Sequence, residues 1–344
     1  MSTHTTSANT KQKPTFTEIG KADHPRETKG GEQCQLYIFA VCSLLVNFIL
    51  LDESLTGGPI LSTANGIWSD LPPHPNYPNL LESVYKAQFH LADFVNKADE
   101  VTREVNEWVG KETEGLVNNI LPHGVVNKYT RLILANALYF NGVWENKFNA
   151  SLTTERDFYL LNGETIKAEF MTSKDDQRIS EYDGFKVLRL EYRNGNDWDR
   201  FFSMNKYLPN AVDGLSGLVN KISSDPEFPE RHKARSPVRV DCLLIPKFNI
   251  SFGFEASEIL KDTGLVFPPP EPRFFHKSFI EVNEEGTEAA GATVAVDDYE
   301  DDGPPPRPKK IVNFVADHPF IFFIKEEVSG VVLFMGIVLN PIIF

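Results

Sequence analysis

The ten residues from 284 to 293 are the part of the sequence best suited to joining a β-sheet as an additional strand. The run consists of Glu284, Glu285, Gly286, Thr287, Glu288, Ala289, Ala290, Gly291, Ala292 and Thr293, and we call it the hinge segment. Small side chains suit a segment that enters between two existing strands. The stretch from Asp297 to Pro308 is rich in Asp and Pro, which favours an extended, exposed chain. The pattern indicates a segment that can join a sheet, with an Ala/Gly-rich linker as the alternative.

The two-residue period of a strand makes the first interpretation specific. If Glu288 faces solvent, alternate residues face inward. The inward set is Thr287, Ala289, Gly291, Thr293 and Ala295. Every member is small and uncharged, so insertion would bury no charge and no bulky side chain.

Catalytic motifs are absent from the sequence. It contains no Walker loop, no G-x-G-x-x-G, no G-x-S-x-G and no H-E-x-x-H. The eight histidines show no ligand spacing with each other or with cysteine, and the carboxylates from Asp297 to Asp302 form a charge run typical of a solvated face. We therefore expect neither an enzyme, nor a cofactor, nor a metal site.

Composition describes an ordinary globular chain with an acidic balance. Its 344 residues are 41% hydrophobic and 24% charged, enough for one or two domains. A net charge of −14 argues against a nucleic-acid partner. Three cysteines, Cys34, Cys42 and Cys242, provide no disulfide scaffold and favour a reducing compartment.

The first 51 residues differ from the rest. Residues 1–35 are polar and predict a disordered segment. Residues 36–51 are sixteen mostly apolar residues, fewer than the roughly 20 of a spanning helix. This length favours a buried core helix over a membrane anchor.

Hydrophobic periodicity predicts an α+β fold with strands carrying most of the core. Apolar spacing predicts a helix over 101–121, ended by Pro122, and shorter helices over 215–222 and 256–260. Strands are predicted over 59–68, 132–140, 158–159, 185–192, 201–208, 238–245, 248–254, 274–282, 311–324 and 330–339. The strand over 132–140 is apolar on both faces apart from Asn136, as a central strand should be.

Several separated segments resemble one family. They are residues 136–144 (NALYFNGVW), 275–283 (FHKSFIEVN), the hinge segment and residues 314–324 (FVADHPFIFFI). In this order they are similar to the hallmark segments of serpins, and the stretch from about Cys42 to Phe344 resembles plant serpins. The resemblance implies a serpin domain over 36–344, with a large central sheet, smaller sheets, surrounding helices and an exposed reactive-centre loop over 284–310.

The same resemblance implies a monomeric suicide inhibitor of a target protease. The protease attacks a bond of the loop, and the loop then inserts into the central sheet while the acyl-enzyme is still intact. It implies no cofactor, no nucleic acid and no membrane partner.

Individual roles follow from the resemblance as well. Asn136 and His276 correspond to the polar pair that closes the central sheet, here called the shutter pair. Trp144, Lys247 and Glu284 correspond to the cluster where insertion begins, here called the breach cluster. A buried pair of Lys247 and Glu284 would be strongly destabilising to break from one side.

The bait bond is expected near Glu300 and Asp301, within about three residues, from the family's spacing after the hinge threonine. The surrounding window is acidic apart from Tyr299. An acidic window favours a serine or cysteine protease that cuts after Asp or Glu, with a chymotrypsin-like cut after Tyr299 as the alternative.

The sequence also departs from the family pattern. Residues 1–35 lack the pattern of the three helices and the strand with which the family begins, so we expect the first helices to be missing. Prolines between Pro268 and Phe274 replace a longer insert, and Asn205 and Lys206 interrupt an apolar strand. A non-inhibitory or defective serpin-like binding protein is therefore the alternative function. Cysteine usage slightly favours the cytoplasm, with the extracellular space as the alternative.

Overall fold

The computed structural model describes residues 57–73, 75, 78–196, 198–262, 271–287 and 310–342. All of them belong to the second of two units, Met1–Val41 and Cys42–Phe344, into which the chain divides. The expectations for residues 1–35, for residues 36–51 and for the bait window around Glu300 and Asp301 lie outside the described residues. The predicted α+β class is confirmed.

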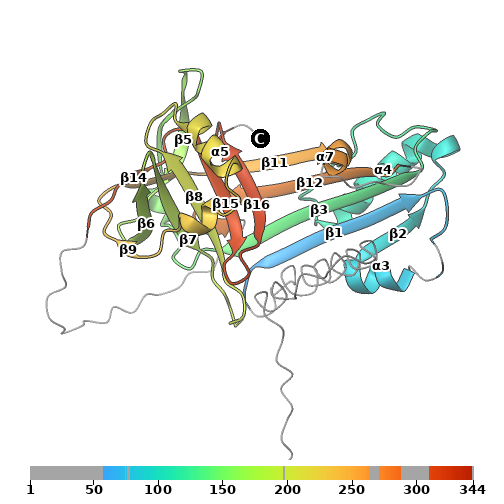
Figure 1. The fold of residues 1–344 in the computed structure, drawn as a ribbon, viewed down its shortest axis with the longest axis horizontal. Coiled ribbons are helices and arrows are strands. Elements are labelled where there is room, and N and C mark those ends of the chain that lie inside the picture. Colours follow the sequence, from blue (N-terminus) through green and yellow to red (C-terminus); the bar gives the residue numbers. More distant parts are fainter. Residues whose placement is uncertain are drawn as a thin grey trace, which may run out of the picture. The chain divides into compact units, whose positions relative to one another are not determined.

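A six-stranded central sheet holds the described start of the hinge segment, residues 284–287 (Figure 1). Its strands are β1 (Ile60–Ser69), β2 (Ala87–Leu91), β3 (Leu132–Val143), β11 (Phe248–Glu255), β12 (Arg273–Val282) and the short β13 (Gly286–Thr287). The order is β11-β12-β3-β1-β2, with β13 paired to β3. β12 runs parallel to β3, whereas β1 and β13 run antiparallel to it.

The described residues form two further sheets. The second contains β14 (Phe314–Val315), β10 (Leu243–Pro246), β5 (Thr165–Met171) and β4 (Thr154–Tyr159), in that order. The third contains β16 (Val332–Val338), β15 (Phe320–Glu326), β8 (Phe202–Pro209), β7 (Phe185–Glu191), β6 (Gln177–Tyr182) and β9 (Pro237–Val238), in that order.

Among the described residues, the helices are few and, apart from α4, short. They are α3 (Pro78–Tyr85), α4 (Phe94–Glu112), α5 (Leu215–Ser223), α6 (Phe228–Arg231), α7 (Ser257–Asp262) and a 3₁₀ helix at Ala150–Leu152. The Asp93 side chain caps α4 by accepting a hydrogen bond of 3.0 Å from the Asn96 main-chain N–H. Among the described residues, no helix has the length and apolarity needed to span a bilayer.

Three boundaries predicted from periodicity are wrong. The helix predicted over 101–121 ends at Glu112, because Glu114, Gly115 and Asn119 all have positive φ angles that a right-handed helix excludes. The run predicted over 238–245 is divided between β9 of the third sheet and β10 of the second. The run predicted over 311–324 is likewise divided between β14 of the second sheet and β15 of the third. Periodicity does not reveal a chain that changes sheets within a few residues.

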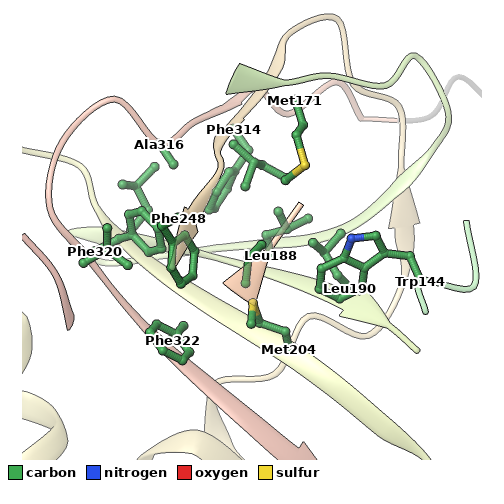
Figure 2. Close-up of a cluster of buried hydrophobic side chains, with 14 of the residues drawn as sticks. Trp144, Met171, Leu188, Leu190, Met204, Phe248, Phe314, Ala316, Phe320 and Phe322 are labelled. Carbon is green, nitrogen blue, oxygen red and sulfur yellow. The ribbon is translucent and has the colours of Figure 1, made fainter. Parts of the chain in front are cut away.

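The two faces of the central sheet pack differently. One face lies against α4, and its cluster includes Trp68, Val105 and Phe275. The other contributes Phe140 and Ile280 to a larger core shared with the other two sheets. Figure 2 shows part of this core, from Trp144 at one end to Phe248, Phe320 and Phe322 at the other.

Strand β8 is buried along its whole length, and Asn205 and Lys206 are among its polar side chains. Asn205 donates hydrogen bonds to the Ser203 hydroxyl (2.9 Å) and to a Glu327 carboxylate oxygen (3.2 Å). Lys206 is completely buried, and among the described residues its Nζ has no hydrogen-bond partner. The Lys206 Nζ lies 5.4 Å from the centre of the Phe248 ring, and burial lowers the pKa of Lys206 to about 7.

Candidate functional site at the open end of the central sheet

The hinge segment begins where two strands of the central sheet separate. β12 pairs with β3 from Arg273 opposite Ile133 to Phe279 opposite Tyr139. β13 then takes the place beside β3, with Gly286 opposite Val143 and Thr287 opposite Gly142. The first two residue pairs of an additional strand are therefore already formed between β3 and β12.

Main-chain contacts hold the start of the hinge segment in place. The Trp144 N–H donates to the Glu285 carbonyl, and the Phe148 N–H donates to the Glu284 carbonyl, both at 2.9 Å. The buried Trp144 indole Nε1 donates to the Asn283 carbonyl, also at 2.9 Å. Residues 283–285 are thus bonded to the end of β3 and to the chain that follows it.

Glu284 and Lys247 of the breach cluster form an ion pair of 3.3 Å beside these contacts. Burial alone would raise the pKa of Glu284, but the Thr153 hydroxyl at 2.6 Å and the Lys247 ammonium hold that pKa below its ordinary value. Lys247 is also paired with Glu169 at 3.1 Å. Burial likewise opposes the charge of Lys247, and the two carboxylates nevertheless raise its pKa.

Only the glutamate of the expected buried pair is buried, whereas the lysine is partly exposed. The Lys247 side chain is 30% exposed and that of Glu284 is 11% exposed. Because Lys247 keeps Glu169 as a second partner, removing Glu284 does not leave an isolated buried ammonium. We therefore expect that removing Glu284 destabilises the fold moderately, and not strongly as predicted for a fully buried pair.

Changing Glu284 to Gln should lower the free energy of unfolding by about 1 kcal/mol at pH 7, the size of a partly exposed ion pair. Because its pKa is depressed in the folded state, Glu284 contributes stability above the ordinary glutamate pKa, and this contribution is lost as the pH falls through the folded pKa. Urea unfolding at pH 7 and pH 3 measures the difference. Glu169→Gln is the control, since Glu169 is 64% exposed and should show a smaller effect. A larger loss at pH 3 than at pH 7 would contradict this account.

Thr287, the first member of the predicted inward set, is fully buried. Its hydroxyl shares a hydrogen bond of 2.6 Å with the Tyr192 hydroxyl. The Tyr192 ring stacks on the Trp144 indole with centroids 4.5 Å apart, and burial raises the pKa of Tyr192 above its ordinary value. The site offers Thr287 one polar partner inside an otherwise aromatic setting.

The shutter pair forms a direct hydrogen bond between β3 and β12. The Asn136 Oδ1 accepts from the His276 Nδ1 at 2.7 Å, and the Asn136 Nδ2 donates to the Asn65 Oδ1 at 2.6 Å. The Asn65 Nδ2 donates in turn to the Tyr85 carbonyl at 3.1 Å. Burial lowers the pKa of His276, which favours a neutral ring with its proton on Nδ1. The chain of bonds joins α3, β1, β3 and β12 across the sheet.

A cavity of about 570 Å³ borders the shutter pair on the sheet face opposite α4. Its lining includes the shutter pair and Asn65, together with apolar residues such as Ile67 and Leu134. Within the described part of the chain, the hydrogen bonds that Asn136 forms with His276 and Asn65 therefore border this cavity on one face of the sheet.

Sequence reasoning did not identify several members of the site. Asn65, Thr153 and Tyr192 hydrogen-bond to Asn136, Glu284 and Thr287, respectively. Asn65 could have been found by the signal that singled out Asn136, an amide inside a predicted strand. Thr153 and Tyr192 show no such signal, because their contacts depend on how distant segments meet.

The titratable side chains described at this site are engaged in ion pairs and hydrogen bonds. Among the described residues, no three His, Cys, Asp or Glu side chains gather as metal ligands. The free Cys242 lies just before β10, and the Glu284 carboxylate is paired with Lys247. What the site can do is form main-chain hydrogen bonds with a further stretch of the loop.

Comparisons with known proteins agree with this geometry. The profile of the family described as Serpin (serine protease inhibitor) matches residues 43–267 and 272–341. Serpin-ZX of Arabidopsis thaliana is 47% identical over 326 residues, covering 87% of this chain and 81% of that protein. Serpin-Z1B of Triticum aestivum is 45% identical over 325 residues, covering 88% of this chain and 80% of that protein.

A solved structure shows the same fold. Arabidopsis AtSerpin1 in its native stressed conformation superimposes with a TM-score of 0.78 at 42% identity, covering 92% of this chain and 87% of that chain. Uncleaved ovalbumin, at 22% identity and a TM-score of 0.66, shares the fold. With three sheets, a strand already started between β3 and β12, and a family profile that covers most of its length, this chain belongs to the serpin family of serine protease inhibitors.

Proposed function

We propose that this serpin traps its target protease by extending β13 along β3 after the loop has been cut. The single observation that carries the proposal is the antiparallel pairing of Gly286 and Thr287 with β3 at the point where β12 leaves it. A ladder that has started in one register continues in that register unless a bulge intervenes.

The register assigns a partner to each further residue of the hinge segment. Continuing from Thr287 opposite Gly142, Ala289 would lie opposite Phe140, Gly291 opposite Leu138 and Thr293 opposite Asn136. β3 extends to Leu132, so it could accept residues as far as Asp297, where the acidic stretch begins.

Side-chain size along this path matches the space beside β3. Directly opposite residues of a sheet point to the same face. The inward set would therefore share the face of Phe140 and Leu138, where Phe140 is fully buried in the core. Small residues at these places add backbone to the sheet without displacing the aromatic side chains already there.

The shutter pair must separate in this mechanism. His276 is now opposite Asn136 in the parallel pairing of β12 with β3. Placing Thr293 opposite Asn136 moves β12 one strand away, a shift of about 4.8 Å, which breaks the 2.7 Å bond between Asn136 and His276. About ten new ladder bonds, at about 0.5–1.5 kcal/mol each, provide a drive on the order of 10 kcal/mol against this loss.

We also propose the kind of target. The window around Glu300 and Asp301 is acidic, so a protease whose specificity pocket is basic fits this loop best. A serine protease is the expected class, a cysteine protease is the alternative, and the inhibitor acts as a monomer. A cut after Tyr299 by a chymotrypsin-like enzyme is the second candidate for the bait bond.

Incubation of the full chain with a Glu-specific serine protease and, separately, with a chymotrypsin-like protease tests the proposal. We expect an adduct that survives SDS with the first enzyme, and mass spectrometry of the released fragment should place the cut within about three residues of the bond between Glu300 and Asp301. Cleavage there without an adduct, with unchanged thermal stability afterwards, would favour the non-inhibitory binding protein. An adduct formed by a cut after Tyr299 would support the same trapping mechanism but place the reactive bond after Tyr299.

A further inference from the structure

An apolar groove of about 690 Å³ lies along the edge of the third sheet. Its walls come from β11 and β12 on one side and from β15, β16 and α5 on the other. The rim is open within the described residues, since Phe252 is 57% exposed and Met335 is 67% exposed. The volume lies within the roughly 300–1,000 Å³ typical of small-molecule sites.

Two rows of side chains lead from this groove to Lys206. In the third sheet, Lys206 is opposite Phe322, and Phe322 is opposite Gly336. Directly opposite residues share a face, and both Phe322 and Gly336 line the groove, so Lys206 is the next side chain inward. On β11, Phe248 shares a face with Ile250, which also lines the groove.

The two rows meet at an aromatic pair beside the lysine amine. The Phe248 and Phe322 rings have centroids 5.4 Å apart, and the Lys206 Nζ lies 5.4 Å from the Phe248 centroid. A second ring, that of Phe320, lies 5.8 Å from the same Nζ. Figure 2 shows these three rings together at one end of the core. They therefore form the boundary between the groove and the amine.

The amine has unused hydrogen-bonding capacity. Lys206 is 0% exposed, and its Nζ has no hydrogen-bond acceptor among the described residues. Ring faces stabilise an ammonium only in part, and a buried ammonium without an acceptor is costly. A carboxylate brought to this position would supply both an acceptor and a counter-charge.

We propose that the groove binds an amphipathic monocarboxylate, with its alkyl chain along the apolar walls and its carboxylate paired to Lys206 after rotation of the Phe322 side chain. None of the residues that line the groove belongs to the hinge segment or the breach cluster. The charge of Lys206 provides selectivity for an acid over an alcohol of the same chain length.

Calorimetric titration of the full chain with dodecanoate and with dodecan-1-ol tests the site. We expect dodecanoate to bind at least about tenfold more tightly than the alcohol, as for a charge-assisted hydrogen bond in a buried place. Lys206→Met should remove this preference, while Lys174→Met, which changes an exposed lysine, should retain it. Urea midpoints of both variants establish that they are folded.

A second variant tests the groove without altering the lysine. Ser223 lines the groove at the end of α5, and Ser223→Phe should weaken binding of the acid and the alcohol alike by reducing the space. The proposal is overturned if dodecanoate does not bind the wild-type chain, as it would not if another part of the chain fills the groove. It is equally overturned if Lys206→Met retains the preference for the acid.

Discussion

Replacing Thr287 with Arg should convert this inhibitor into a substrate of its target protease. Thr287 is fully buried, and its hydroxyl is bonded to Tyr192 at 2.6 Å. An arginine there would have to place a charge among aromatic side chains or hold the hinge segment outside the sheet. Either outcome slows loop insertion, so the acyl-enzyme should be hydrolysed before the loop has inserted. We expect the yield of SDS-stable adduct to fall at least about tenfold while cleavage of the loop continues.

The adjacent residue supplies a matched control for this experiment. Strand parity places Glu288 on the opposite side from Thr287, so Glu288→Arg should retain most of the adduct although it makes a larger change in charge. Adduct and cleaved inhibitor are measured together by gel densitometry. An unchanged adduct yield from Thr287→Arg would refute insertion in this register, and equal losses in both variants would indicate an effect of charge alone.

Replacing Lys206 with Met should stabilise the protein strongly at neutral pH. Burial lowers the pKa of Lys206 from 10.5 to about 7, so between these values the unfolded chain holds a proton that the folded chain lacks. At about 1.4 kcal/mol per unit, burying this amine costs on the order of 4 kcal/mol at pH 7. Methionine has a similar length and no charge, and it can pack between the Phe248 and Phe320 rings.

The pH dependence distinguishes this effect from a general gain in packing. Stability of the wild-type chain should rise with pH between about 7 and 10.5 relative to the variant, so the advantage of Lys206→Met should shrink by about 1.4 kcal/mol per unit. Urea unfolding at pH 7 and pH 9.5 measures it, with Lys174→Met as the exposed control. An advantage that is equal at both pH values would show that the lysine amine is not the source.

Much of the fold was predictable because hydrophobic periodicity is local. The strands β1, β7 and β12 begin and end within one or two residues of the predicted runs. The inward position of Thr287 could also be predicted, since parity fixes it once Glu288 is assumed to face solvent. Both inferences need only the spacing of residues along the chain.

Contacts between distant segments could not be predicted in the same way. Lys206 was recognisable as a polar residue in an apolar strand, but its burial without an acceptor depends on Phe248 and Phe320, which come from other strands. Lys247 has a second ion-pair partner, Glu169 of β5, for which the sequence gives no indication. Side-chain environment is a property of the assembled sheets.

The two residue pairs between β13 and β3 also have a kinetic meaning. Forming the first pairs of a strand is the unfavourable step, because chain entropy is lost before many hydrogen bonds are gained. In this protein that nucleation is complete before any protease arrives, since Gly286 and Thr287 are already in register. In the proposed mechanism, trapping then competes with hydrolysis as the elongation of a strand that has already started.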